Sequence, residues 1–222
     1  MVLVLWDVDG TLVRTAGHGR WAFEEAFKTV VGRLPEPVDY AGRTDRQIAL
    51  TMLGGEDHHL DPLLEELEAA LELRKEALRM EGYAYPGVPE VLEALHARDD
   101  VVQSLLTGNI LPNAMVKVSA FGLERWLDFE VGSYGSDPHD VRSDLVAVAR
   151  QRANAKYGEP TDVVLVGDTP LDVRAAHEAG ARAVAVETGF AERDALVASQ
   201  PDQLLEDLTD TAAAIAAITA ST

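Results

Sequence analysis

Three short, mainly apolar runs constrain the fold of this chain more than any other feature of its sequence. They span residues 2–5, 101–106 and 163–166, and each ends in a turn that carries polar side chains. Runs of this length and composition are typical of strands buried on both faces of a sheet. From residue 86 onward such strands alternate with helical segments, which indicates parallel strands joined by right-handed crossovers. We therefore predict an α/β protein with a Rossmann-like parallel sheet.

Residues 16–85 follow a different pattern, with helical periodicity and breaks in place of strands. Thr44 and Gln47 have the spacing of a capping box, which predicts a helix that ends at Gly54. Leucines between positions 60 and 78 keep one apolar face, on a helix that Gly82 ends. We predict an inserted α-helical cap domain at residues 16–85 and an α/β core formed by residues 1–15 and 86–222.

An acidic pair, Asp7 and Asp9, follows the first apolar run directly. Because successive side chains of an extended chain point to opposite faces, these two carboxylates lie on the same side. Carboxylates this close repel each other unless a cation lies between them, and the carboxyl ends of the strands are where open α/β sheets bind ligands. Taken alone, the segment fits an ordinary Asp- and Gly-containing turn equally well.

Composition narrows the possible functions. The chain has 222 residues, a formal net charge of −19 and no cysteine. So acidic a protein is not expected to bind nucleic acid or an anionic membrane, because both depend on Lys and Arg neutralising phosphates. The lack of cysteine excludes disulfides and a thiol nucleophile. The amino terminus lacks the basic region of a signal peptide, so we expect a cytoplasmic protein.

The order of the motifs resembles that of the haloacid dehalogenase superfamily. The chain carries Asp7-Val8-Asp9-Gly10-Thr11, then Thr107 after a strand, then Gly167-Asp168 with Asp172 four residues further on. The resemblance covers nearly the whole chain and is closest to the phosphoglycolate-phosphatase-like branch, whose cap lies between the first two motifs. It implies a phosphatase that hydrolyses small phosphate monoesters through an aspartyl-phosphate, with Mg²⁺ as cofactor and a small phosphorylated metabolite as partner.

The resemblance also implies roles for individual residues. Asp7 is the expected nucleophile, and Asp9 the general acid and later the general base. Thr107 and the backbone around Gly108 and Asn109 are expected to donate hydrogen bonds to the phosphoryl oxygens. Mg²⁺ is expected to bind Asp7, the backbone carbonyl of Asp9, and Asp168, with Asp172 orienting its ligands. Each of these residues also has a plainer interpretation as a turn or helix-cap residue.

One position departs from the family pattern. The superfamily places a Lys between the second and third motifs, and residues 135–145 of this chain contain none. We predict that Arg142 replaces it, because a guanidinium can hold phosphate through a two-pronged contact. Lys117 is the rival, although its place on a helix favours a solvated surface residue. Arg43, just before the expected cap residue Thr44, is the candidate for contacting a second anionic group of the substrate, and a solvent-facing turn residue is an equal alternative.

Three classes of function stay open at this point. A Mg²⁺-dependent phosphatase leads. A phosphosugar mutase of the same superfamily, which would return the phosphoryl group to the sugar, comes second, since the sequence does not place a cap histidine clearly. A catalytically inactive phosphate-binding module is third, because Asp7, Asp9, Thr107 and Asp168 are all present. The oligomeric state is not predicted.

Overall fold

The structure is a computed structural model that describes residues 1–40, 42–55, 57–137 and 141–220. The strands are β1 Val2–Trp6, β2 Val13–Arg14, β3 Tyr83–Ala84, β4 Val101–Leu105, β5 Asp162–Gly167, β6 Arg182–Val186 and β7 Gln203–Leu205. The α-helices are α1 His18–Val31, α2 Asp45–Met52, α3 Leu60–Leu73, α4 Lys75–Glu81, α5 Val88–His96, α6 Leu111–Ser119, α7 Arg142–Tyr157, α8 Pro170–Glu178, α9 Arg193–Ala198 and α10 Thr211–Thr219. Short 3₁₀ turns lie at Asp57–His59, Glu124–Trp126 and Phe129–Val131.

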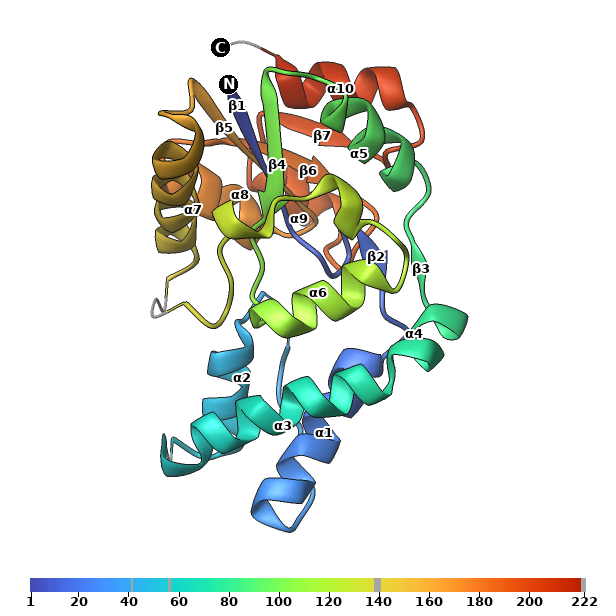
Figure 1. Ribbon diagram of the computed structural model, residues 1–222, viewed down its shortest axis with the longest axis vertical. Helices are drawn as coiled ribbons and strands as arrows, with labels where there is room; N and C mark the ends of the chain where they lie inside the picture. The colour runs from blue at the N-terminus through green and yellow to red at the C-terminus, as the bar shows by residue number, and fades with distance from the viewer. Residues whose placement is uncertain (41, 56, 138–140, 221–222) are drawn as a thin grey trace.

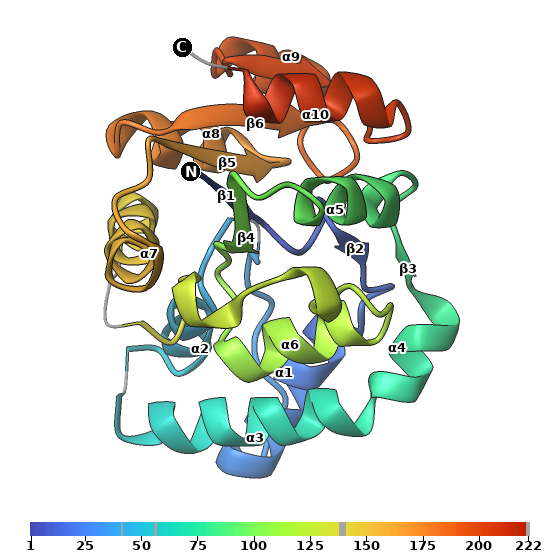
Figure 2. The ribbon, with the colours of Figure 1, turned by 45° about the horizontal axis from the view of Figure 1, so that its top comes forward.

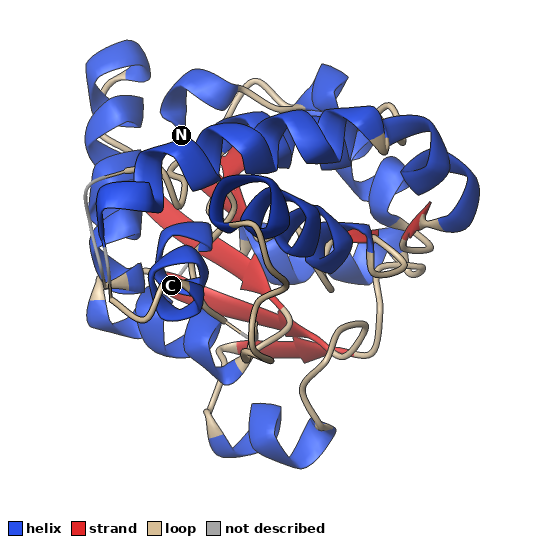
Figure 3. Cartoon of the chain, turned by 90° about the horizontal axis from the view of Figure 1, so that it is seen from below, coloured by secondary structure: helices blue, strands red, loops and turns tan. Residues whose placement is uncertain are grey.

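A parallel sheet with the strand order β4-β1-β5-β6-β7 forms the centre of the protein. Alternate residues of β1 face opposite sides of it. Val4 and Trp6 belong to a hydrophobic cluster with α5 and α10, whereas Leu3 and Leu5 pack with α7 and α8. Helices therefore cover both faces of the sheet (Figure 3), which confirms the predicted α/β fold class and explains why its strands are mainly apolar.

The sheet order places the three polar motifs together. β1 lies between β4 and β5, so Asp7, Thr107 and Asp168 all follow neighbouring parallel strands at the same edge of the sheet. The fully buried Trp6 donates a hydrogen bond through its indole N–H to Gln103 of β4, with 3.2 Å between the nitrogen and oxygen. This buried polar contact helps fix the register of β1 against β4.

The helical insert, α1 to α4, lies beyond this edge of the sheet (Figures 1 and 2). It joins the rest of the chain through β2 and β3, which pair antiparallel as a two-stranded ribbon. Its own hydrophobic cluster, which includes Phe23, Phe27 and Leu67, extends onto Ile110 and Val116 at the start and middle of α6. The insert therefore packs on a helix of the α/β core.

The structure corrects one sequence-based expectation about this insert. The leucine-rich segment forms two helices, α3 and α4, which meet at Arg74. The Arg74 side chain donates to the buried His18 ring and lies over Trp21, so tertiary contacts accompany the break. The capping box of Thr44 and Gln47 is present as predicted. In the core, the short strand β7 and helix α9 were not predicted.

Among the described helices, none has the length and apolar composition needed to cross a membrane.

Candidate active site

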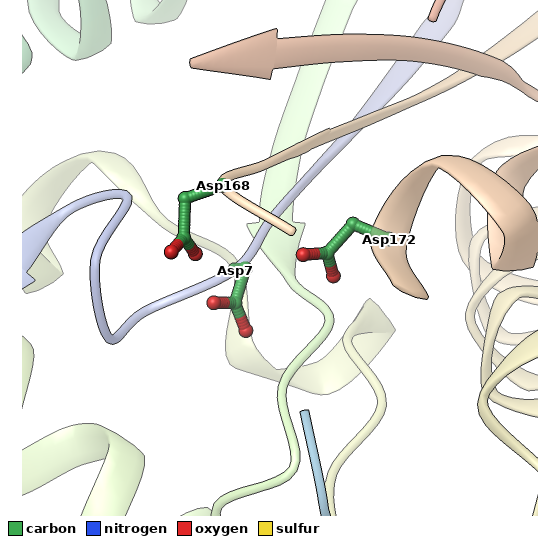
Figure 4. Close-up of side chains that lie close together, drawn as sticks. All are labelled: Asp7, Asp168 and Asp172. Carbon is green, nitrogen blue, oxygen red and sulfur yellow. The ribbon is translucent and has the colours of Figure 1, made fainter. Parts of the chain in front are cut away.

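Three carboxylates converge where β1 and β5 end. Asp7 follows β1, Asp168 follows β5, and Asp172 lies in the first turn of α8. All three are buried, and each offers an oxygen atom that lies within 4.8 Å of the others. The close-up shows the side chains of Asp168 and Asp172 directed toward Asp7 (Figure 4). This confirms that the sequence motifs meet in space, although they are about 160 residues apart.

Backbone geometry keeps these carboxylates in place. Asp172 forms a capping box with Thr169, whose hydroxyl lies 2.6 Å from Asp172 Oδ2. The backbone N–H of Phe190 donates to Asp168 Oδ2 at 3.0 Å. A Cβ atom on Gly189 would lie 1.7 Å from that same oxygen, so this position must be glycine for the loop to approach Asp168. The sequence reasoning missed this loop after β6, because it carries no charged motif.

Burial and mutual repulsion make the carboxylates unfavourable as free anions. Burial raises the pKa of Asp7 well above its ordinary value, and Asp172, Asp168 and Asp9 add to the effect while Arg142 opposes it. Burial, with the charge of Asp172, raises the pKa of Asp168 to about 7. A cation among these groups would therefore stabilise their ionised forms.

Arg142, at the start of α7, supplies one cation. Its Nη2 donates to Asp7 Oδ1 at 2.8 Å and lies 2.5 Å from Asp172 Oδ1. The second contact lacks hydrogen-bond geometry, so the buried Asp172 Oδ1 accepts no hydrogen bond, and the buried Nε of Arg142 donates none. One guanidinium thus leaves the acidic cluster incompletely satisfied. Residues 138–140, part of the segment in which the family's Lys was sought, lie outside the described residues.

The carboxylate of Asp9 has different partners. Lys117 Nζ lies 2.9 and 2.7 Å from its two oxygens, and the side-chain amide of Asn109 donates to Asp9 Oδ2 at 2.8 Å. Lys117 also donates to Asn109 Oδ1 at 2.5 Å, and Asn109 donates to Thr107 Oγ1 at 2.7 Å. The expectation that Lys117 is a solvated surface residue is wrong, because only 5% of this residue is exposed. The helix α6 turns it inward, one turn after the buried Asn113.

These groups line one cavity of about 530 Å³ between the sheet edge and the insert. All of the site residues predicted from the sequence line it, namely Asp7, Asp9, Arg43, Thr107, Gly108, Asn109, Arg142, Asp168 and Asp172. The insert contributes Arg20, Phe23 and Tyr40 as well as Arg43. The rings of Phe23 and Tyr40 meet edge to face with centroids 5.7 Å apart, so this wall is partly aromatic. Arg43 is exposed, and its side chain donates a long hydrogen bond to the Thr51 hydroxyl, with 3.4 Å between the two atoms.

The acidic cluster has the properties of a metal site. Its donors are carboxylate oxygens, which Mg²⁺ prefers. Asp172 Oδ1 meets Arg142 as an ion pair but accepts no hydrogen bond, and the pKa values of Asp7 and Asp168 are raised, which indicates that the three carboxylates need more positive charge than Arg142 provides. The carboxylate of Asp9 lies outside the cluster, as expected if that residue offers a metal only its backbone carbonyl.

Comparisons with known proteins agree with this geometry. Residues 1–180 match the model of the haloacid dehalogenase-like hydrolases. The chain is 29% identical over 220 residues to phosphoglycolate phosphatase 1 of Pseudomonas aeruginosa. The matched region covers 94% of this chain and 77% of that protein. It is 25% identical over 213 residues to pyrophosphatase PpaX of Halalkalibacterium halodurans, with 93% of both chains covered.

A solved structure gives the same picture of the fold. A haloacid dehalogenase-like hydrolase from Streptococcus pneumoniae superimposes with a TM-score of 0.67 at 20% identity, over 96% of this chain and 97% of that one. The family match over most of the length identifies the chain as a member of the haloacid dehalogenase-like hydrolases.

Proposed function

We propose that this hydrolase is a Mg²⁺-dependent phosphatase that acts on small phosphate monoesters through an aspartyl-phosphate on Asp7. One observation carries the proposal. The Asp7 carboxylate lies in the cavity between a cluster of further acids with Arg142 on one side and the Asp9–Lys117–Asn109 network on the other. This arrangement supplies a nucleophile, a proton donor and positive charge around one reacting phosphorus atom.

In the first step an oxygen of Asp7 attacks the phosphorus, and the bond from phosphorus to the ester oxygen breaks. Asp9, two residues further along, gives a proton to the leaving alkoxide. In the second step Asp9 takes a proton from water, whose oxygen attacks the phosphorus, so that inorganic phosphate leaves and the Asp7 carboxylate is restored. This two-step reaction needs one carboxylate that attacks phosphorus and another that transfers protons. Asp7 and Asp9 have different contacts, since Asp7 pairs with Arg142 and Asp9 with Lys117.

The two cations are assigned to different parts of this reaction. Arg142 contacts Asp7, which supports the role that we assign to it of holding the transferring phosphoryl group. Lys117 contacts Asp9 and Asn109, so we assign to it the phosphoryl oxygens on the side of the leaving group. Thr107 and the backbone of Gly108 and Asn109 complete the set of donors. The sequence left Arg142 and Lys117 as alternatives for holding the phosphoryl group. We propose instead that each of them contacts a different part of it.

Asp7, Asp168 and Asp172 would hold Mg²⁺, together with the backbone carbonyl of Asp9. The metal would neutralise the charge of the phosphoryl group and of its acceptor. Arg142 would remain beside Asp7. The chain's own residues thus place the phosphorus, and a bound metal would balance the negative charge that they and the substrate bring together.

The substrate is proposed at the level of its class. The relatives named above are a phosphoglycolate phosphatase and a pyrophosphatase, which favours a small phosphorylated metabolite with further negative charge. Arg43, at the insert wall of the cavity, is the proposed contact for that second charge. A cytoplasmic location likewise stays a prediction, as does the cap role of residues 16–85.

A phosphosugar mutase fits this cavity less well. Among the described residues, no histidine lines it. His18, the histidine closest in sequence to the first motif, is buried against Glu81 and Arg74, 3.1 and 3.3 Å away respectively. Its ring therefore contributes to the packing of α1 against α4 and not to the cavity.

The proposal is tested with a panel of phosphorylated metabolites and p-nitrophenyl phosphate, each with Mg²⁺ and with EDTA. We expect phosphate release that requires the metal and is absent from Asp7→Asn. Asp61→Asn, at an exposed position on α3, is the matched control and should behave like the wild type. Release of phosphate in EDTA at the same rate, or no release from any monoester, would overturn the proposal.

A further inference from the structure

Asp45, the first residue of α2 in the insert, makes two hydrogen bonds to the core. Its Oδ2 accepts from the backbone N–H of Ile110 at 2.8 Å, and its own backbone N–H donates to the carbonyl of Gly108 at 2.7 Å. Only 5% of Asp45 is exposed. These two bonds join the insert to both neighbours of Asn109, whose side chain contacts Asp9, Thr107 and Lys117.

The backbones of the two parts touch at this point without side chains between them. A Cβ atom on Gly108 would lie 2.4 Å from the carbonyl oxygen of Arg43, and one on Gly135 would lie 1.9 Å from the carbonyl oxygen of Gly108. The segment with Arg43 and Asp45 therefore fits against the 107–110 loop only because these positions are glycine. Ile110 and Val116 continue the contact by packing in the hydrophobic cluster of the insert.

The bond from Asp45 also completes the start of α6. Ile110 is the N-cap of that helix, and its own backbone N–H is one of the groups at a helix start that have no acceptor within the helix. Asp45 supplies that acceptor from the other part of the molecule. Because α6 carries Lys117, the position of the insert is linked to the Lys117 side chain as well as to Thr107 and Asn109.

We propose that Asp45 is a positioning residue, which holds the 107–110 loop and the start of α6 in their reactive arrangement only while the insert is seated on the core. The proposal rests on the phosphatase function proposed above. Asp45 is part of the cavity wall, but its hydrogen bonds run to the 107–110 loop and not to Asp7, Asp168 or Asp172. Without the insert in this position, Ile110 N–H and Gly108 C=O would lose these partners, and the donors of the loop would be free to shift. A shift of about 1 Å in such groups is enough to lower a rate by about a hundredfold.

The electrostatic surroundings of Asp45 agree with this role. Burial raises its pKa to about 7, with Lys117 and the Ile110 hydrogen bond acting in the opposite direction. The buried carboxyl group accepts from one loop of the core, and the backbone N–H of the same residue donates to that loop. The insert and the core are thus joined at Asp45 by directional hydrogen bonds and not only by packing.

The test compares substitutions that separate the hydrogen bond from the charge. Asp45→Asn keeps an oxygen that can accept from Ile110, so kcat should stay within about threefold of the wild type. Asp45→Ala removes the acceptor and should lower kcat about ten- to a hundredfold on p-nitrophenyl phosphate, with KM changed by less than about threefold. Asp45→Glu keeps the charge but is too long for the space, and should also lower kcat. Asp61→Ala, on the exposed face of α3, is the matched control.

Amide hydrogen exchange provides a readout that does not depend on activity. In Asp45→Ala the Ile110 amide should exchange about tenfold faster or more, while amides of β1 and β5 keep their wild-type rates and show that the core is folded. Asp45→Asn should keep the Ile110 amide protected. Wild-type kcat and Ile110 protection in Asp45→Ala would overturn the proposal. So would an equal loss of kcat in Asp45→Ala and Asp45→Asn, which would assign the effect to charge.

The test of Asp45 can be distinguished from the test of the proposed phosphatase function. If the wild-type protein releases no phosphate from any monoester with Mg²⁺, the phosphatase proposal fails. The exchange rate of the Ile110 amide then still decides whether Asp45 holds the loop, because that measurement needs no substrate.

Discussion

Asp7 and Asp9 leave the same strand two residues apart, yet the structure gives them contrasting surroundings. The Asp7 side chain is 10% exposed and faces Asp168, Asp172 and Arg142. The Asp9 side chain is 32% exposed and is held by Lys117 and Asn109. Alternation along an extended strand brings both carboxylates to one cavity, and the elements that pack around each then decide its chemistry.

The contrast explains how one strand end can serve two steps. Asp7 is surrounded by further acids, so its ionised form requires cations and its place favours attack on a phosphorus atom. Asp9 faces away from that cluster, toward the polar loop after β4, where a proton can pass to a leaving group. Each carboxylate has its own basic residue, and these two residues come from different helices, α7 and α6.

The largest expected effect is that of removing the Asp7 charge. Asp7→Asn should lower kcat by at least about 10³-fold on every substrate, because an amide cannot form the acyl phosphate. Asp9→Asn should depend on the leaving group, with a far smaller loss on p-nitrophenyl phosphate than on an alkyl phosphate, which needs protonation. Equal losses on the two substrates in Asp9→Asn would remove the distinction between the two carboxylates.

Metal removal should act on the Asp7 side. With EDTA the activity should fall to background, and Mg²⁺ should restore it. Binding of Mg²⁺ should also raise the Tm of the wild-type protein, because a ligand that binds only the folded state stabilises it. Asp168→Asn should lose this Tm increase, whereas Asp9→Asn should keep most of it, since Asp9 offers the metal only a backbone carbonyl. An increase that survives in Asp168→Asn would place the metal elsewhere.

The two cations should give different losses. Arg142→Ala should lower kcat/KM about a hundredfold on all substrates, because a charge-assisted donor in a buried site is worth about 3 kcal/mol. Arg142→Lys should recover part of this loss, since it keeps the charge but not the planar group. Lys117→Ala should lower kcat/KM more on alkyl phosphates than on p-nitrophenyl phosphate, following Asp9→Asn. A loss in Lys117→Ala that does not depend on the leaving group would assign Lys117 to the transferring phosphoryl group itself.

The sequence was enough to predict the hydrolase family, the parallel α/β core and the residues that meet in the cavity. Apolar runs that end in acid carry this information, because parallel strands bring their carboxyl ends to one edge. Features that depend on contacts between residues distant in sequence could not be predicted in this way. The break between α3 and α4 occurs at Arg74, a good helix former that contacts His18 and Trp21, and no local signal marks it.

Lys117 illustrates a signal that was present but misread. A lysine on a helix is normally solvated, and this expectation placed Lys117 on the surface. Yet it lies between Val116 and Val118 and one turn after Asn113, on a helix with few other charges. A lone cation on an otherwise apolar helix that follows a phosphate-binding motif indicates an inward-facing group. The loop at Gly189 and Phe190, in contrast, has no such signal, because it supports Asp168 through its backbone.

The smallest effect on turnover is expected from the charge of Asp45, which acts on stability instead. Asp45 has a folded-state pKa of about 7, above its ordinary value of 3.8, because of burial. Its contribution to stability is therefore fully present below about pH 4, is lost as the pH rises toward 7, and is constant above that. Asparagine does not titrate, so the free energy of unfolding of the wild type minus that of Asp45→Asn should fall between pH 4 and pH 8, by at most about 4 kcal/mol for a pKa raised from 3.8 to about 7. Urea unfolding in EDTA measures this difference at each pH. A difference that stays flat, or rises with pH, would mean that Asp45 is ionised without cost, and Lys117 would then stabilise the carboxylates of both Asp45 and Asp9.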